Sequence, residues 1–124
     1  MKTIFKSILL AFVLMPMLGA AQNASIDAAL QGGNASGLTP YLAKSVDVLL
    51  LGDESTVTAS QATTMLADFF TKSAVKGYKQ NHLSAAQNGK STYSIGDLST
   101  GNGSYRVTMM YDATKKISEI RIEK

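Results

Sequence analysis

The sequence predicts an α+β fold, in which helices pack on one side of a curved antiparallel sheet. One amphipathic helix lies near the middle of the chain, and the segments after it have the residue pattern of strands. Near the end, Gly101-Asn102-Gly103 separates two β-patterned runs, and Asn-Gly between such runs is a strong hairpin signal. In the second run, residues 105, 107, 109 and 111 alternate with the residues between them, which places one set on a buried face.

The first 21 residues have the layout of a secretory signal peptide. Lys2 and Lys6 give a positive start, and an apolar run from Ile8 to Leu18 is followed by three small residues. A membrane anchor is the alternative interpretation, but the run has eleven positions and a helix that spans a bilayer needs about 20. We expect cleavage after Ala21, which leaves a single domain over residues 22–124 with no transmembrane segment.

The composition narrows the class of protein further. The sequence contains no cysteine, which excludes a lipoprotein anchor, a disulfide framework and cysteine chemistry. Removing Lys2 and Lys6 leaves ten basic against nine acidic residues, so the net charge falls from +3 to +1. No basic stripe remains to indicate a nucleic-acid partner. We therefore expect a secreted or periplasmic protein that does not bind nucleic acid.

Two short helices and a strand hairpin are expected before the long helix. The spacing of Ile26, Ala29 and Leu30 predicts a short helix from about residue 25, which a pair of glycines ends. A second short helix or turn fits residues 34–44. The apolar run Val46–Leu51 predicts a strand, and residues 55–58 fit a short return strand.

The long helix begins at a capping box, in which Thr58 and Gln61 have the spacing of hydroxyl and amide partners. Its apolar positions recur at i, i+3, i+4, i+7 and i+8 and form one stripe: Ala62, Met65, Leu66, Phe69 and Phe70. Four strands follow, over about residues 77–86, 91–98, 104–111 and 117–123, with Asn88-Gly89 as a second hairpin signal.

This order of elements resembles the cone-shaped nuclear transport factor 2-like fold, a cystatin-like α+β architecture. Within it, the chain is similar to the small secreted proteins of Bacteroidota grouped as the DUF4783 family. The matching segments are Ile26–Leu30, Gln61–Phe70, Tyr93–Leu98, Arg106-Val107 and Ile120–Ile122. The resemblance implies a curved antiparallel sheet packed on one long and two short helices. It carries over no catalytic residues, and the wider superfamily includes isomerases, dehydratases, binding modules and dimerisation domains.

Two side chains are candidates for catalysis. His82 is the only histidine, and strict alternation along its strand puts it on the same face as Tyr78, where it could act as a general base or polar anchor in the cone. The alternative is a partly buried histidine bonded to a neighbouring strand. Asp68 lies next to the apolar stripe of the long helix and could serve as a base, or it could be a solvated surface acid.

Aromatic and polar side chains supply the candidates for ligand binding. These are Tyr41, Phe69, Tyr78, His82, Tyr93 and Tyr105. The alternative is that several of the tyrosines form cross-strand pairs that stabilise the sheet. Arg106 could bind an anion or pair with Glu119 or Glu123. One histidine and no cysteine indicate no structural zinc site, and no cofactor motif is present.

We expect a non-enzymatic protein that binds a small apolar molecule or a partner protein through the cone. The alternative is a small isomerase- or dehydratase-like enzyme with His82 or Asp68 as general base. A third expectation is a homodimer formed through the exposed sheet face around Arg106, Thr108 and Met110.

Overall fold

The structure is a computed structural model that describes residues 24–84 and 92–124. The predicted signal peptide and the Asn88-Gly89 turn lie outside the described residues. The described elements are, in chain order, a helix over residues 24–31, the 3₁₀ turns η1 (Ala35–Gly37) and η2 (Thr39–Tyr41), the strands β1 (Leu42–Leu50) and β2 (Asp53–Thr58), the helix α2 (Ala59–Ser73), and the strands β3 (Val75–Leu83), β4 (Thr92–Thr100), β5 (Gly103–Tyr111) and β6 (Ile117–Glu123).

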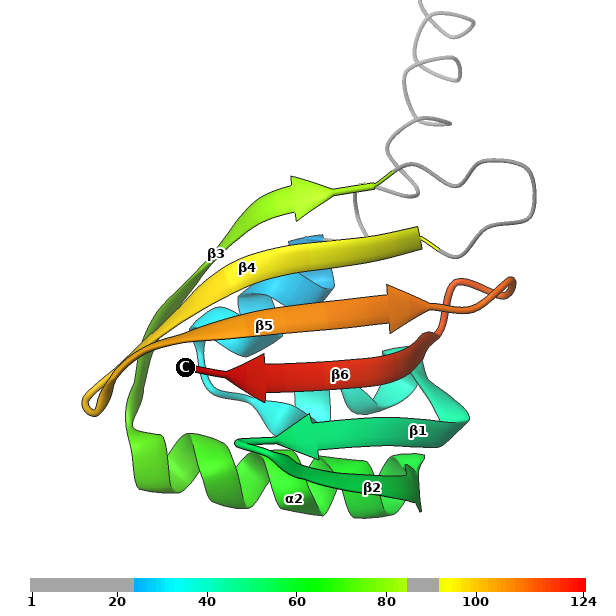
Figure 1. Ribbon diagram of the computed structural model, residues 1–124, viewed down its shortest axis with the longest axis horizontal. Coiled ribbons are helices and arrows are strands. Elements are labelled where there is room, and N and C mark those ends of the chain that lie inside the picture. Colours follow the sequence, from blue (N-terminus) through cyan, green and yellow to red (C-terminus); the bar gives the residue numbers. More distant parts are fainter. Residues whose placement is uncertain (1–23, 85–91) are drawn as a thin grey trace, which may run out of the picture.

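The described strands form one sheet with the order β2-β1-β6-β5-β4-β3 (Figure 1). The last four strands of the chain make the predicted meander, and β1 pairs with β2 as the predicted hairpin. The sheet is not antiparallel throughout, however, because β1 runs parallel to β6. β1 and β6 are the first and last strands in the chain, and short-range turn signals predict only the pairs that tight turns connect.

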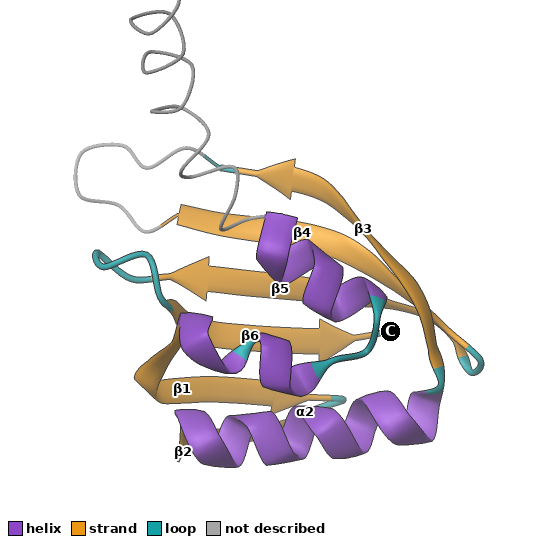
Figure 2. Ribbon diagram, turned by 180° about the vertical axis from the view of Figure 1, so that it is seen from behind, coloured by secondary structure: helices purple, strands orange, loops and turns teal. Residues whose placement is uncertain are grey.

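All the described helices lie on one face of the curved sheet, which we call the concave face (Figure 2). The helix over residues 24–31 lies over β4 and β5, and α2 runs along β1 and β2. The opposite face, which we call the outer face, is turned toward the viewer in Figure 1, and none of the described helices covers it there. The predicted curved sheet on one long and two short helices is therefore confirmed, with η1 and η2 in place of a second regular helix.

α2 forms where the sequence predicts it. The Thr58 hydroxyl accepts a hydrogen bond from the Gln61 amide at 3.2 Å, and the Gln61 side chain accepts one from the Thr58 amide at 3.1 Å. This reciprocal pair satisfies two of the amide groups that a helix start leaves free. The buried face of α2 is the predicted stripe, apart from the partly buried Met65, and it includes Leu66, Phe69 and Phe70.

The core lies between the concave face and the helices. Its largest side chains that are nearly inaccessible to solvent come from the first helix, the turns, α2 and the sheet: Ile26, Leu30, Leu38, Val46, Val48, Leu66, Leu98, Val107, Met109, Ile117, Ile120 and Ile122. Much of the space under the helices is therefore filled by aliphatic side chains.

Candidate functional site

Three buried oxygen atoms have no hydrogen-bond partner among the described residues: Asp27 Oδ1, Tyr78 OH and Gln80 Oε1. They come from two elements, the first helix and the strand β3. Asp27 belongs to the helix over residues 24–31, and the other two belong to β3. Buried polar groups in folded proteins nearly always have partners, so such oxygens mark a place where a partner is expected.

Tyr78 and Gln80 point to the concave face, because each pairs with a residue of β4 that lies on that face. Tyr78 pairs with Leu98, and Gln80 pairs with Gly96. The Tyr78 ring crosses Gly96, where a methyl group would overlap the Tyr78 hydroxyl. Glycine at position 96 therefore creates the space in which the Tyr78 hydroxyl lies over β4.

A second tyrosine hydroxyl nearby does have a protein partner. Tyr111 on β5 and Ser94 on β4 form a buried hydrogen bond of 3.1 Å between their hydroxyl groups. Ser94 is fully buried, and Tyr111 is buried on the same concave face. We call Asp27, Tyr78, Gln80, Ser94 and Tyr111 together the concave polar cluster.

The groups of this cluster influence one another's ionisation. Burial raises the pKa of the Asp27 carboxyl above its usual value. Burial also raises the pKa of Tyr78, and the negative charge of Asp27 raises it further. The pKa of Tyr111 is raised by burial, lowered in part by the Ser94 hydrogen bond, and raised by Asp27. The carboxylate of Asp27 thus lies within electrostatic range of both phenols.

Apolar side chains surround the concave polar cluster. In the sheet, Val107 pairs with Gly96 and Met109 pairs with Ser94, and both side chains are fully buried. Ile26, next to Asp27 in the first helix, is also buried. The concave polar cluster therefore lies in an apolar interior.

His82 lies on the outer face, not on the face of Tyr78. A β-bulge between Gln80 and His82 adds one residue to β3, so that His82 pairs with Ile95. The His82 ring lies 5.5 Å from the ring of Tyr93, which alternates with the concave residues of β4. The expected shared face with Tyr78 is therefore wrong, because one inserted residue reverses the direction of every later side chain.

Asp68 is a surface residue. Its carboxylate forms an ion pair of 3.0 Å with Lys72, one turn further along α2, and its side chain is 63% exposed. This is the solvated surface acid that the sequence left open as the alternative. Asp68 lies on α2, which runs along β1 and β2, whereas Tyr78 and Gln80 lie on β3 at the opposite edge of the sheet (Figure 2).

The other predicted ligand-binding residues are dispersed. Phe69 and Tyr105 are buried and meet edge to face with their ring centroids 5.3 Å apart, which makes them core neighbours. Tyr41 is partly buried in η2. Tyr93 lies on the outer face beside His82. Of the predicted set, Tyr78 alone belongs to the concave polar cluster.

Sequence reasoning missed Asp27 as a candidate. The available signal was its position between Ile26 and the pair Ala29 and Leu30, which places an acid at the edge of the apolar face of the first helix. The direction of that edge depends on how the helix crosses the sheet. In the folded structure one Asp27 oxygen is buried, and the charge of Asp27 raises the pKa of Tyr78.

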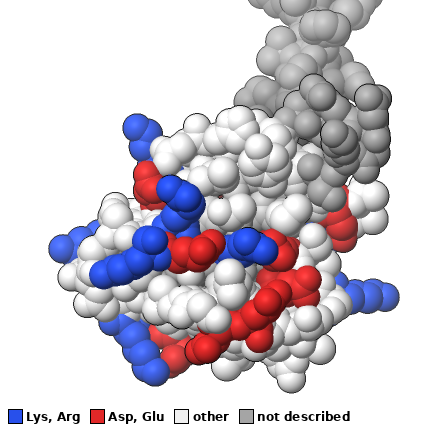
Figure 3. All heavy atoms as spheres, in the orientation of Figure 1, with Lys and Arg blue, Asp and Glu red and all other residues white. Residues whose placement is uncertain are grey.

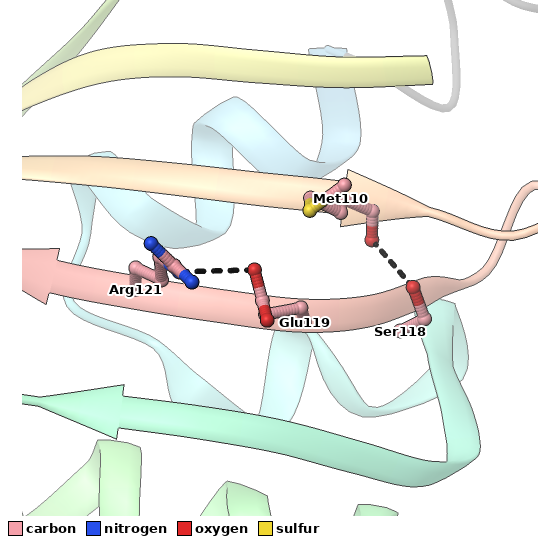
Figure 4. A network of polar contacts seen from close by, with 4 residues as sticks. All are labelled: Met110, Ser118, Glu119 and Arg121. Carbon is pink, nitrogen blue, oxygen red and sulfur yellow. Dashed lines mark hydrogen bonds and ion pairs between the residues drawn. The ribbon is translucent and has the colours of Figure 1, made fainter. Parts of the chain in front are cut away.

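The charged residues of the outer face are unevenly distributed. Figure 3, seen from this side, shows acidic and basic side chains together over part of the sheet and few over the rest. Close to the middle, Arg121 pairs with Glu119 at 3.0 Å, and the Ser118 hydroxyl donates to the Met110 carbonyl at 3.2 Å (Figure 4). Arg106 takes part in neither of the two ion pairs found among the described residues. A homodimer through this face stays a prediction.

In residues 24–84 and 92–124, no three histidine, aspartate or glutamate side chains come together as ligands for a metal ion. No helix within the same residues has the length and apolar character needed to cross a membrane.

A curved sheet that holds one long helix and shorter helical segments on its concave face defines the nuclear transport factor 2-like, or cystatin-like, fold. Consistent with this, the chain superposes on a steroid delta-isomerase from Pseudomonas aeruginosa with a TM-score of 0.60. The match has 16% sequence identity and covers 84% of this chain and 77% of that chain. At this identity the likeness shows the fold alone.

The chain belongs to the DUF4783 family, because the family described as "Domain of unknown function (DUF4783)" matches residues 23–123. The crystal structure of a DUF4783 protein from Bacteroides ovatus is 31% identical, with 82% of this chain and 93% of that chain covered and a TM-score of 0.74. One from Bacteroides fragilis is 30% identical, with 81% and 95% covered and the same TM-score. A comparison with curated proteins gives no match.

Proposed function

We propose that this protein binds a small, mostly apolar molecule on the concave side of its sheet and performs no chemistry on it. The polar part of that molecule contacts the concave polar cluster, and the apolar part lies against the surrounding core side chains. The observation that carries the proposal is the group of buried, unpartnered oxygens on Asp27, Tyr78 and Gln80.

The energetic reason is the desolvation of these oxygens. Leaving a buried hydrogen-bonding group without a partner costs about 1–3 kcal/mol. A small domain has a total stability of about 5–15 kcal/mol, so the free-energy cost of three such groups is large relative to that stability. A ligand that supplies the missing partners removes this penalty and gains affinity from it.

The positions of the predicted bases favour binding over catalysis. An isomerase- or dehydratase-like enzyme that used His82 or Asp68 would need that side chain inside the cone. His82 instead lies on the outer face beside Tyr93, and Asp68 is paired with Lys72 on the surface.

Two-dimensional ¹H–¹⁵N NMR spectra test the proposal. The labelled protein is titrated with small molecules that each combine an apolar body with one polar group. We expect the amide signals of residues 78–80, 94–98 and 24–31 to shift, because these segments surround the concave polar cluster. Shifts confined to outer-face residues, or no shifts with any compound, would overturn the proposal.

A matched pair of variants on β4 makes the test specific. Gly96→Ala places a methyl group where the Tyr78 hydroxyl lies, so it should abolish the shifts. Ser99→Ala changes an exposed residue of the same strand and should leave the shifts intact. A compound that still shifts the same signals in Gly96→Ala would bind somewhere other than the concave polar cluster.

We also propose that the protein acts outside the cytoplasm. The support is the signal-peptide layout of residues 1–21 and the absence of cysteine. The intact mass of the exported protein should correspond to a chain that begins at Gln22. A full-length chain that stays in the cytoplasm would contradict this proposal.

A further inference from the structure

We propose that the polar group of the ligand is a protonated amine, so that the concave polar cluster selects a small organic ammonium ion. This inference rests on the proposed function, because it assigns the chemical class of the molecule that the same site binds. It follows from the hydrogen-bonding character of the three unpartnered oxygens, from the charges around them and from the surrounding apolar side chains.

The unpartnered oxygens require donors. An ionised carboxylate and an amide oxygen can only accept hydrogen bonds, so Asp27 Oδ1 and Gln80 Oε1 both need an N–H or O–H group from a ligand. The Tyr78 hydroxyl can accept as well as donate. A primary ammonium group has three donors and no acceptor, and it therefore matches this set in kind and in number.

The charges around the oxygens favour a cation. Asp27 makes neither of the two ion pairs of the described residues. Besides burial, the pKa of Tyr78 is raised by Asp27, Tyr111 and Asp97, which are all groups that ionise to a negative charge. A negatively charged ligand would be repelled by Asp27, whereas an ammonium ion would form a charge-assisted hydrogen bond with it.

The side chains around the cluster are apolar, which indicates that the rest of the ligand is apolar as well. Ile26, Val107 and Met109 are almost inaccessible to solvent and lie beside the cluster residues in their elements. These side chains suit an alkyl or aryl body and give the site a low dielectric, which strengthens the attraction between unlike charges. A hydrated inorganic cation fits less well, because Asp27 is the single carboxylate of the cluster.

Isothermal titration calorimetry with three probes of equal chain length tests the inference at neutral pH. The probes are hexylammonium chloride, hexan-1-ol and sodium hexanoate. We expect hexylammonium to bind about tenfold tighter than hexanol, because one charge-assisted hydrogen bond replaces a neutral one. Hexanoate should bind most weakly of the three.

Two variants locate the source of this preference. Asp27→Asn should reduce the affinity for hexylammonium to that for hexanol, because the charge is lost while the side-chain shape is kept. Asp68→Asn removes the same charge from the exposed surface of α2 and should leave all three affinities unchanged. Tyr78→Phe removes one oxygen while the ring is kept, and it should weaken hexylammonium binding several-fold. This variant replaces Asp27→Asn as the test if Asp27→Asn does not fold.

The outcomes separate this inference from the proposed function. If the three probes bind equally well, or hexanoate binds best, the ammonium preference is wrong while a concave binding site remains. A preference for hexylammonium that survives in both Asp27→Asn and Tyr78→Phe would also overturn the inference. If none of the probes binds, the proposed function fails and the inference fails with it.

Discussion

Tyr78 and Tyr111 are two buried tyrosines in opposite situations. The Tyr111 hydroxyl shares a hydrogen bond with Ser94, whereas the Tyr78 hydroxyl has no partner among the described residues. Both rings pack into the same concave interior, and both are less than a tenth exposed. A fold that needed only packing at position 78 could use phenylalanine there. The hydroxyl at this position is the group that the proposed ligand would contact.

Removing each hydroxyl should therefore affect stability differently. Tyr111→Phe should lower the free energy of unfolding by about 0.5–1.5 kcal/mol, because Ser94 loses its partner. Tyr78→Phe should leave it unchanged or raise it, because an unsatisfied buried group disappears. Urea unfolding of both variants beside the unchanged protein measures the two effects. Equal losses in the two variants would mean that the Tyr78 hydroxyl has a structural partner.

Asp27 makes the stability of the protein depend on pH. Burial raises its pKa in the folded state above the usual 3.8, so over the interval between the two values the folded chain holds a proton that the unfolded chain has released. The contribution of Asp27 to stability therefore falls as the pH rises through this interval. Tyr78 and Tyr111, the neighbouring titratable groups, have raised pKa values as well and stay neutral there.

Replacing this carboxyl should remove its part of the pH dependence. Asp27→Asn should gain stability relative to the unchanged protein as the pH rises above 3.8, and the difference should level off above the raised pKa. Below 3.8 the difference should be constant. Urea unfolding at a series of pH values measures it. A difference that does not change with pH would contradict a raised pKa for Asp27.

At the scale of the element, the β-bulge in β3 decides which side chains enter the cone. Before the bulge, Tyr78 and Gln80 face the helices, and after it His82 faces outward. The extra residue, Asn81, donates a hydrogen bond of 2.8 Å to the Asp97 carboxylate on β4. Alternation along a single strand cannot predict this, because a bulge depends on contacts with the neighbouring strand.

The start of α2 is the opposite case, since a local signal determines it. Thr58→Ala should lower the free energy of unfolding by about 0.5–2 kcal/mol, because the capping hydrogen bond to the Gln61 amide is lost. Thr64→Ala, an exposed position within the same helix, serves as the control and should change stability by less than about 0.5 kcal/mol. Thermal or urea unfolding compares the two. An equal loss in both variants would indicate a general effect on the helix rather than a cap.

At the scale of the whole molecule, local patterns predicted most of the fold and little of the site. The stripe of α2, the Gly101-Asn102-Gly103 hairpin and the final meander depend on neighbours in sequence, and these predictions are confirmed. The parallel pairing of β1 with β6 and the effect of the Asp27 charge on Tyr78 depend on segments far apart in the chain. No periodicity or spacing within one segment contains that information.

Phe69 connects the long helix to the sheet. It is 6% exposed, and it packs edge to face against Tyr105 of β5 and against Phe70, with ring centroids 5.3 and 6.1 Å away. Phe69→Ala should therefore lower the free energy of unfolding by about 3–5 kcal/mol, through lost burial and the cavity left behind. Phe69→Leu should lose much less. A small loss for alanine in urea unfolding would show that α2 packs loosely on the sheet.

The most direct test of ligand binding is a crystal structure of the protein grown with hexylammonium chloride. We expect the ligand nitrogen within about 3.2 Å of Asp27 Oδ1 and of the Tyr78 hydroxyl, with the alkyl chain against the apolar side chains of the concave face. A concave polar cluster without the ligand, or a ligand bound only on the outer face, would contradict both the binding site and its preference for an ammonium ion.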